Sequence, residues 1–489
     1  MHSRYIDTVM AEIWSDQKKL ALWQETELCV LKARAEMHKI PFEVYEKISG
    51  FLMAEPIDLK FWQERDAVIH HDLNAFLEER KRHLPPELRR YFHDGMTSYD
   101  TEEAAFARTL DKSLGVVLGK VGPLERFLGQ LAIDHRQTVM MGKTHGQEAE
   151  LMTFGRRVLS WLAELKNARL QMEKARNNLS YSKLSGAIGN YSSISPDLEK
   201  RALELVGSKS GMLMLPFVGA TQIMPRSMYV PLASSLATMV CVLAKIANDI
   251  RLMARTPNPL VQEPFGKKQK GSSAMPHKKN TISSEQMEGM ARMAKGYFQM
   301  VLDNVFTWEE RAIEQSCVER VAWPDLFHVA LRSLKVMSNV IFGLRIYPKN
   351  MLREVLESAG CYASAVAKEV LKELGEEYNL GDEDAYRIVQ LAAFNARGAF
   401  STDVIGNLED SESWAHQANG RLYPESIRLI IAHAHLTVSS QLEADQEQVD
   451  VWNQRLSEIF SNEDNCRRWE RVFSFSYLLR HEQYVFENV

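Results

Sequence analysis

Apolar residues recur at steps of three and four along one stretch of this chain, and this spacing constrains the fold more than any other feature. They are Leu232, Leu236, Met239, Leu243, Ile246, Ile250 and Met253. This spacing places them on one face of a helix with 3.6 residues per turn. A helix from Pro231 to Arg255 would be about 35 Å long at a rise of 1.5 Å per residue. Helices of that length are typical of an elongated helix bundle.

Helical spacing also dominates the rest of the chain, and strand signals are scarce. Apolar residues alternate with charges at helical spacing from Trp14 to Met37, from Val158 to Leu179 and from Val329 to Leu344. Short runs such as Met212 to Val218 are β-like, and a proline interrupts that one. The sequence therefore predicts an all-α fold.

The length of 489 residues exceeds what one ordinary hydrophobic core supports. Turn-forming residues mark two boundaries, one in the segment from Tyr91 to Asp100 and one at Tyr347-Pro-Lys-Asn350. We expect an N-terminal helical domain over residues 1–98, a central long-helix bundle over 99–346 and a C-terminal helical domain over 347–489. The last of these includes a polar stretch, Asp410-Ser-Glu-Ser-Trp414.

Composition limits the classes of partner and the cellular compartment that we expect for the chain. The net charge of -5 argues against nucleic acid as the main partner. Five scattered cysteines without a CxxC pair are typical of reduced, intracellular proteins. No signal peptide is indicated at the N-terminus, so we expect a cytoplasmic protein. The apolar run from Tyr229 to Ala247 approaches the length of a membrane span, but polar residues interrupt it, which favours a buried bundle helix and no membrane.

A segment without helical periodicity extends from Arg255 to Thr281. After it, Ser283 and Gln286 have the spacing of a capping box that opens the next helix. A loop of this length inside a compact domain is uncommon and is usually a lid, a binding loop or disordered. Its lysines indicate an anionic ligand: Lys267, Lys268, Lys270, Lys278 and Lys279. On these grounds alone, a catalytic loop and a flexible loop without chemistry are equally good interpretations.

The loop contains Gly271-Ser-Ser-Ala-Met-Pro-His-Lys-Lys-Asn280, which closely resembles the signature loop of the fumarase/aspartase superfamily. With Lys270 before it, the segment is similar to the form found in the adenylosuccinate lyase family. Other segments match in order: Arg4-Tyr5, His71-Asp72, Thr97-Ser98, Met141-Gly-Lys-Thr-His-Gly146, Ser185-Gly-Ala-Ile-Gly189, Thr221-Gln222, Glu310-Arg311, Ser316, Glu319-Arg320 and Pro324-Asp325. The resemblance implies a three-domain fold with a central bundle of long helices.

The resemblance also implies a β-elimination in which a C–N bond breaks and fumarate leaves, without a cofactor. The family's substrates are adenylosuccinate, which gives AMP, and a succinylated imidazole-carboxamide ribotide (SAICAR), which gives AICAR in purine synthesis. By this resemblance, Ser272 is the base, and Lys278 with Asn280 stabilises a dianionic intermediate. His145 is the general acid for the leaving nitrogen, because an imidazole titrates near neutral pH. Without the family context, a lone histidine is more often structural.

A nucleotide substrate with two carboxylates and a phosphate needs cationic partners. Arg311 and Arg320, with Ser316 between them, match family positions that contact the substrate, and guanidinium groups suit such anions. The alternative for both arginines is ion pairing with nearby glutamates. The other implied contacts are Arg4, Tyr5, His70, His71, Asp72, Thr97, Ser98, Thr144 and Gln222.

The consecutive residues His70, His71 and Asp72 allow two interpretations. By the resemblance, the Asp72 carboxylate would hold the tautomer of His71. The three could instead indicate a metal site, but no spaced cluster of further ligands supports one, so no metal is expected.

The resemblance further implies a homotetramer whose long helices form a common bundle, with each site assembled from three subunits. Several residues depart from the family's usual pattern: His70, Thr281, Ala312, Glu314 and Gln315. Of these, His70, Glu314 and Gln315 lie beside presumed contacts. The nearest alternative is another lyase of the superfamily, acting on argininosuccinate, aspartate or a specialised succinyl-amine. A catalytically silent helical scaffold is an alternative of a different class.

Overall fold

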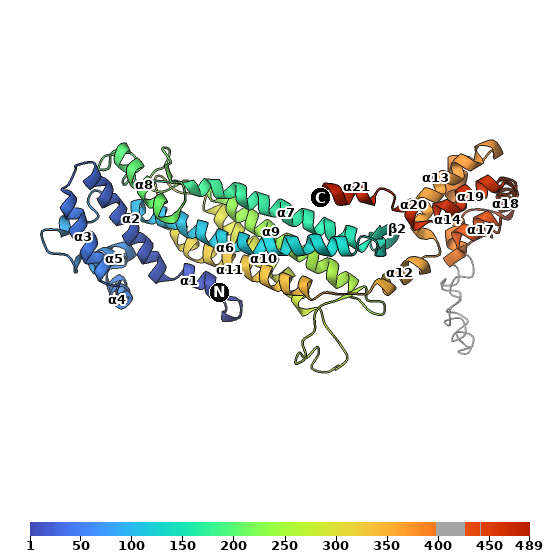
Figure 1. The fold of residues 1–489 in the computed structure, drawn as a ribbon, viewed down its shortest axis with the longest axis horizontal. Coiled ribbons are helices and arrows are strands. Elements are labelled where there is room, and N and C mark those ends of the chain that lie inside the picture. The colour runs from blue at the N-terminus through green and yellow to red at the C-terminus, as the bar shows by residue number, and fades with distance from the viewer. Residues whose placement is uncertain (398–425, 441) are drawn as a thin grey trace. The chain divides into compact units, whose positions relative to one another are not determined.

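In the computed structural model of the chain, residues 1–397, 426–440 and 442–489 are described, and their helices confirm the predicted all-α class (Figure 1). The chain forms two compact units. Unit 1 comprises Met1–Glu125, Glu164–Leu252 and Glu263–Gly343, and unit 2 comprises Arg126–Ala163, Met253–Gln262 and Leu344–Val489. The three-domain division stays a prediction, and the polar stretch from Asp410 to Trp414 lies outside the described residues.

The α-helices have these bounds: α1 Thr8–Ile13, α2 Asp16–Glu36, α3 Phe42–Ala54, α4 Leu59–Ile69, α5 Asp72–Lys81, α6 Ser98–Asp134, α7 Phe154–Arg176, α8 Pro196–Ser210, α9 Val230–Met253, α10 Ile282–Asp303, α11 Glu314–Phe342, α12 Pro348–Glu357, α13 Ser364–Gly375, α14 Asp382–Arg397, α17 Ile427–Ala432, α18 Gln446–Ile459, α19 Glu463–Val472, α20 Phe475–Leu478 and α21 Glu482–Asn488. The strands are β1 Val139–Thr144, β2 Gln147–Thr153, β3 Tyr181–Ser182, β4 Leu215–Pro216, β5 Val261–Gln262 and β6 Arg345–Ile346.

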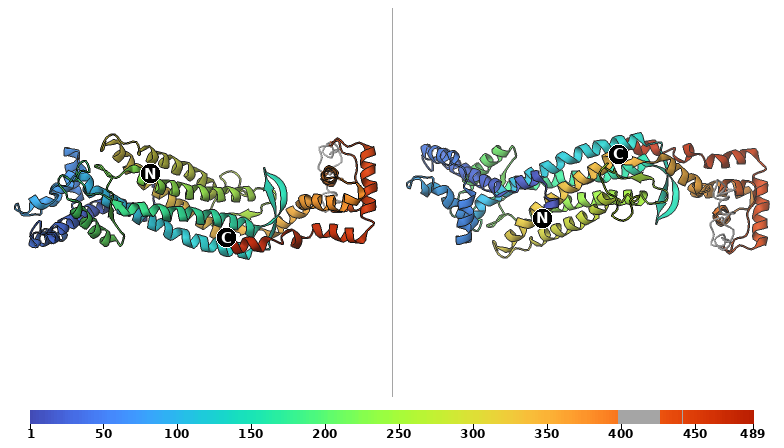
Figure 2. Two further views of the ribbon diagram at one scale, coloured as in Figure 1. Left: turned by 90° about the horizontal axis from the view of Figure 1, so that it is seen from above. Right: turned by 90° about the horizontal axis from the view of Figure 1, so that it is seen from below.

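Unit 1 is built on long helices, with α6, α9, α10 and α11 running side by side (Figures 1 and 2). The apolar face predicted for α9 is its buried face: Leu232, Leu236, Met239, Leu243, Ile246 and Ile250 are all 0% exposed. Burial of each such side chain contributes about 1.5–3 kcal/mol. The predicted helices from Trp14, Val158 and Val329 correspond to α2, α7 and α11.

The apolar character of α9 has an explanation in this core. Among the described residues, one helix, over Arg226–Met253, is long and apolar enough to cross a membrane by length and composition. However, 61% of its most apolar window is buried inside the protein. The core of unit 1 therefore accounts for its apolar residues.

The strands form three two-stranded sheets in the described part of the chain, and one hairpin was not predicted. β1 and β2 pair antiparallel, with Thr144 opposite Gln147. The two residues between them, His145 and Gly146, have φ of 52° and 78°. Two-residue turns with positive φ match the twist of paired strands, and glycine adopts this conformation at little cost. The hairpin thus presents His145 at its tip.

Unit 2 has its own hydrophobic core, formed by α13, α14, α17, α18 and α19. Trp452 and Trp469 are 1% and 0% exposed and anchor this core. Their indole N–H groups donate to the Asp384 carboxylate at 3.1 Å and to the Arg428 carbonyl at 3.0 Å, so neither buried donor lacks a partner.

The predicted capping box at the start of α10 is wrong, because Ser283 lies inside the helix. The N-cap position belongs to Thr281, whose side chain makes no capping hydrogen bond. The Glu263 carboxylate takes this role: it accepts from the backbone N–H groups of Ser284 at 2.8 Å and Ser283 at 3.3 Å. A carboxylate at a helix N-terminus satisfies unpaired donors and complements the helix dipole.

We expect Glu263→Ala to lower the free energy of unfolding by about 1–2 kcal/mol, because it removes the cap of α10. Urea unfolding followed by circular dichroism measures this change. Thr281→Ala is the matched control and should have little effect, since the Thr281 side chain makes no capping bond. Equal destabilisation by the two variants would contradict this assignment of the cap.

Candidate active site

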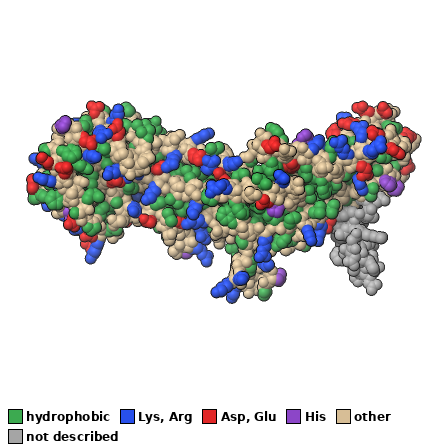
Figure 3. Space-filling view, in the orientation of Figure 1, with side chains coloured by type: hydrophobic (Ala, Val, Ile, Leu, Met, Phe, Trp, Pro, Cys, Tyr) green, Lys and Arg blue, Asp and Glu red, His purple; other side chains and the backbone are tan. Residues whose placement is uncertain are grey.

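The signature loop, residues 271–280, is closed by a hydrogen bond between its two ends. The Asn280 side-chain amide donates to the Gly271 carbonyl at 3.0 Å. A β-carbon on Gly271 would lie 1.9 Å from the Lys278 carbonyl oxygen, so this close approach of two backbone segments requires glycine. Basic side chains gather on this segment and the residues before it (Figure 3), and all five predicted lysines are exposed.

The Ser272 hydroxyl oxygen accepts two backbone hydrogen bonds inside the loop. The donors are the N–H groups of Met275 at 3.0 Å and Ala274 at 3.3 Å. Backbone donors aimed at an oxygen stabilise negative charge that develops on it. The surroundings of Ser272 therefore suit a serine oxygen that loses its proton.

Two predicted contacts, Gln222 and Arg311, lie together. Arg311 Nη1 donates to Gln222 Oε1 at 3.0 Å, and its guanidinium lies over the Tyr99 ring at 4.2 Å from the centroid. The Tyr99 hydroxyl accepts from the Gln315 side-chain amide at 3.1 Å. Gln315, one of the departures from the family pattern, thus positions the ring on which Arg311 stacks.

Arg320 and Asp72 also lie together, with Arg320 Nη2 and Asp72 Oδ2 separated by 2.9 Å. The prediction that Asp72 holds the tautomer of His71 is therefore wrong. His71 is the N-cap of α5, and its Nδ1 accepts from the Asn74 N–H at 3.3 Å. With Nδ1 as acceptor, the proton of a neutral His71 ring is on Nε2. His70 is exposed and ends α4 with a left-handed φ of 53°.

Thr97 and Ser98 are fixed at the start of α6 by a buried ion pair. Thr97 N–H donates to the Asp100 carboxylate at 2.9 Å. Lys183, like Asp100 0% exposed, donates to that carboxylate at 2.6 Å and to the Gly186 carbonyl at 2.9 Å. The pair therefore joins the first turn of α6 to the Ser185–Gly189 segment.

The other predicted residues occupy separate places. Arg4 and Tyr5 belong to a short 3-10 helix, Ser3–Tyr5, which contacts α11. Thr144 and His145 are exposed on the hairpin of unit 2, whereas the other candidate residues belong to unit 1. Within unit 1, the signature loop lies apart from α5 (Figure 1). One chain thus forms the pairs Gln222–Arg311 and Asp72–Arg320 but does not bring the signature loop to α5.

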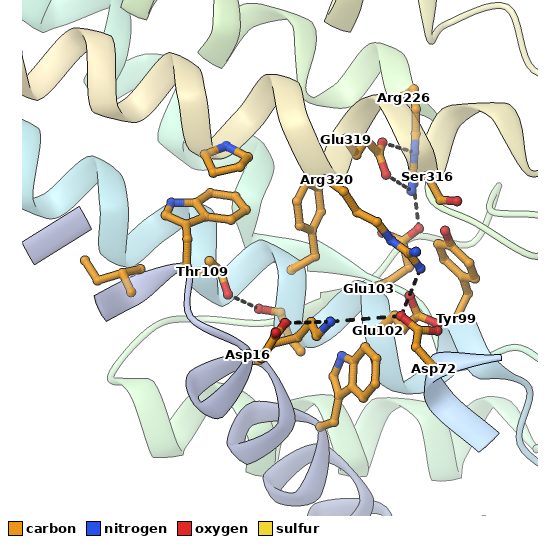
Figure 4. A pocket seen from close by; sticks show the side chains of 17 residues that line it. Asp16, Asp72, Tyr99, Glu102, Glu103, Thr109, Arg226, Ser316, Glu319 and Arg320 are labelled. Carbon is orange, nitrogen blue, oxygen red and sulfur yellow. Dashed lines mark hydrogen bonds and ion pairs between the residues drawn. The ribbon is translucent and has the colours of Figure 1, made fainter. Parts of the chain in front are cut away.

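A cavity of about 280 Å³ lies among α2, α5, α6 and α11 (Figure 4). Three predicted contacts line it: Asp72, Ser316 and Arg320. Aromatic rings of Trp14, Trp23, Tyr99 and Phe106 form much of its wall. This mixture of apolar walls and a few convergent polar groups is typical of ligand sites.

The cavity contains acidic residues that the sequence analysis did not select. Arg226 Nη1 pairs with Glu103 at 2.5 Å and its Nε pairs with Glu319 at 2.7 Å. Burial raises the pKa of the Glu102 carboxyl to about 8, and the Asp72 carboxylate adds to this rise. Glu102 lies one helical turn after Ser98, and no local pattern in the sequence marks it as facing a cavity.

Among the described residues, no group of three or more His, Cys, Asp or Glu side chains gathers as metal ligands do. The His70-His71-Asp72 segment in particular is engaged in helix capping and in the Arg320 ion pair.

Sequence comparisons identify the family. Residues 9–296 match the Lyase family. The adenylosuccinate lyase of Synechocystis sp. is 36% identical over 396 residues, which cover 81% of this chain and 89% of that protein. The adenylosuccinate lyase of Aquifex aeolicus is 35% identical over 412 residues, which cover 84% of this chain and 92% of that protein. The chain belongs to the adenylosuccinate lyase family.

Solved structures show the fold that this family member shares. A fumarate lyase from Mesorhizobium sp. BNC1 matches with a TM-score of 0.72 and 21% identity, over 97% of this chain and 99% of that chain. A 3-carboxy-cis,cis-muconate lactonizing enzyme from Pseudomonas putida matches with a TM-score of 0.70 and 20% identity, over 98% of each chain. The predicted fumarase/aspartase-like fold is confirmed.

We expect Asp100→Asn to lower the free energy of unfolding by about 3–5 kcal/mol, because it leaves the Lys183 ammonium buried without its negative partner. Urea unfolding measures the change. Glu64→Gln, which removes the exposed Lys60–Glu64 pair at 3.8 Å, is the control and should shift stability by less than about 0.5 kcal/mol. Similar losses of stability in both variants would show that the buried pair stabilises the fold no more than the exposed pair does.

We expect Gly271→Ala to reduce lyase activity by about 100-fold, because its β-carbon forces the loop open and displaces Ser272. Gly266→Ala, in the segment just before the signature loop, is the matched control, since its β-carbon would meet only the Gln269 side chain at 3.8 Å. Initial rates, with circular dichroism to confirm intact helices, measure the effect. Full activity of Gly271→Ala would contradict the role of this closed loop.

Proposed function

We propose that this lyase cleaves a C–N bond by β-elimination, converting adenylosuccinate to AMP and fumarate, and SAICAR to AICAR and fumarate. The observation that carries the proposal is the signature loop, in which the Ser272 oxygen accepts from two backbone N–H groups. Relatives that bear the name adenylosuccinate lyase match more than four-fifths of the chain. The product AMP places the reaction in purine nucleotide synthesis.

In the proposed reaction, Ser272 removes the proton from the carbon next to a substrate carboxylate. The electron pair of that C–H bond first enters the carboxylate as a dianionic intermediate and then forms the C=C bond of fumarate as the C–N bond breaks. Lys278 and Asn280 stabilise the added negative charge. His145 gives the leaving nitrogen its proton, so the reaction needs neither a cofactor nor a metal.

The remaining predicted residues would bind the nucleotide substrate. Arg311 and Arg320 supply guanidinium forks for phosphate and carboxylate groups, and Ser316 supplies a hydroxyl between them. The further contacts in this proposal are Arg4, Tyr5, His70, His71, Asp72, Thr97, Ser98, Thr144 and Gln222.

We also propose a cytoplasmic homotetramer in which each site combines residues of several subunits. The signature loop, which contains Ser272, lies apart from α5, which begins at Asp72, and this separation within unit 1 supports shared sites (Figure 1). None of the five cysteines, all of which lie in the described part of the chain, forms a disulfide bond, which fits a reducing compartment.

Incubation with adenylosuccinate, with SAICAR and with argininosuccinate, followed by the absorbance of released fumarate, tests the proposed reaction. We expect turnover of the first two and none of the third. Turnover of argininosuccinate alone would favour a different lyase of the superfamily. No turnover of any substrate would favour a silent scaffold.

We expect Ser272→Ala and His145→Ala each to lower kcat by at least about 100-fold without loss of helical circular dichroism, because each removes a proton-transfer group. Mixing the two inactive variants under conditions of subunit exchange should restore part of the activity if sites are shared. Lys349→Ala, at an exposed position on α12, is the control and should remain active. Loss of helical content in either inactive variant would make that residue structural.

A further inference from the structure

Five carboxyl groups line the cavity of unit 1, and four of them have a cationic partner. Asp16 lies 3.2 Å from the Lys19 ammonium, Asp72 lies 2.9 Å from Arg320, and Glu103 and Glu319 share Arg226. Glu102 is the exception among these five, because its carboxyl group forms no ion pair or hydrogen bond with the described residues. A carboxyl group without a partner in a mostly apolar cavity is unusual in a folded protein.

The charged groups that face Glu102 come from four other parts of unit 1. Asp72 of α5 repels its negative charge, whereas Arg311, Arg320 of α11 and Lys19 of α2 attract it. On α6 itself, burial raises the pKa of the Tyr99 hydroxyl, and the negative charge of Glu102 adds to this rise. Glu102 thus shares the cavity with Arg320, and Arg311 stacks on Tyr99, another residue of the cavity wall.

The partners of Arg320 and Arg311 offset only part of the positive charge of these two side chains. Asp72 already offsets part of the charge of Arg320, and Arg311 donates to a neutral amide rather than to a carboxylate. A negative charge on Glu102 would offset the remaining positive charge of both guanidinium groups. A neutral Glu102 would leave that charge available.

We propose that Glu102 is a specificity-determining residue whose charge sets how strongly Arg311 and Arg320 attract the anionic groups of the substrate. This inference rests on the proposed nucleotide-binding role of the two arginines. Neutral Glu102 permits tight binding of a multiply charged anion, and the Glu102 carboxylate weakens that binding without entering the proton transfers.

The expected pH dependence of substrate binding has a definite direction. Burial raises the pKa of Glu102 from 4.5 to about 8, so the side chain is mostly neutral at pH 7 and becomes negative as the pH rises through 8. Substrate binding should therefore weaken above pH 8. The phosphate of the substrate does not contribute to this weakening, because its second pKa is about 6 and its charge is therefore nearly constant above pH 8.

The experiment compares the full-length wild type with Glu102→Gln, which is neutral at every pH. KM and kcat for adenylosuccinate are measured from about pH 7 to about pH 9.5, above the second pKa of a phosphate. We expect the wild-type KM to rise several-fold across this range and that of Glu102→Gln to stay flat, with kcat changing alike in both. Glu102→Asp, which keeps a titratable carboxyl, should restore a rise in KM. Glu12→Gln, which removes an exposed carboxyl of α1, should match the wild type.

Calorimetric binding of AMP over the same pH range gives a readout that does not need turnover. If Glu102→Gln fails to fold, the wild-type AMP profile still tests the inference, because a flat profile would overturn it. A wild-type enzyme that turns over adenylosuccinate but has the same KM profile as Glu102→Gln would overturn the role of Glu102 and leave the proposed function intact. Failure of the wild type to turn over adenylosuccinate would instead count against the proposed function.

Discussion

The buried Arg226 guanidinium fixes the position of two helices that carry much of the candidate site. It pairs with Glu103 of α6 and with Glu319 of α11, and its side chain is 2% exposed. An ion left buried without its partner costs several kcal/mol, so this arrangement tolerates little sliding of α6 against α11. Glu102 and Arg320, which neighbour the paired carboxylates in sequence, face one cavity as a result.

The first turns of α6 connect more of unit 1 than this one triad. Three polar residues near the start of the helix bond to different segments: Asp100 to Lys183, Thr101 to Glu27 of α2, and Glu103 to Arg226. Each bond satisfies a buried polar group, so each also removes alternative packings. The start of α6 is therefore a rigid reference for the side chains around it, and this rigidity is what a binding site requires.

The sequence alone predicted those structural features that follow from a local pattern of residues. The apolar face of α9 was visible because burial leaves a helical period in the residues themselves. The β1–β2 hairpin was missed because its strands meet at polar residues, Lys143-Thr144 and Gln147-Glu148, that carry no strand signal.

The family resemblance supplied the candidate site residues. It could not supply their partners: Asp72 bonds to Arg320 because α5 and α11 approach each other, at a sequence separation that no local pattern records. Glu102 escaped notice for the same reason, since only the packing of α6 turns a helical glutamate toward a cavity.

The Glu263 carboxylate has a mechanical consequence for the loop that it precedes. Because it bonds to Ser283 and Ser284, residues 263–284 form a ring of chain whose two ends meet at one buried group. The entropy of closing a ring depends only weakly on its length, by about 0.6 kcal/mol for each doubling. The number of residues in the loop therefore has little effect on the free energy of closing this ring, and the anchor at its base has a large one.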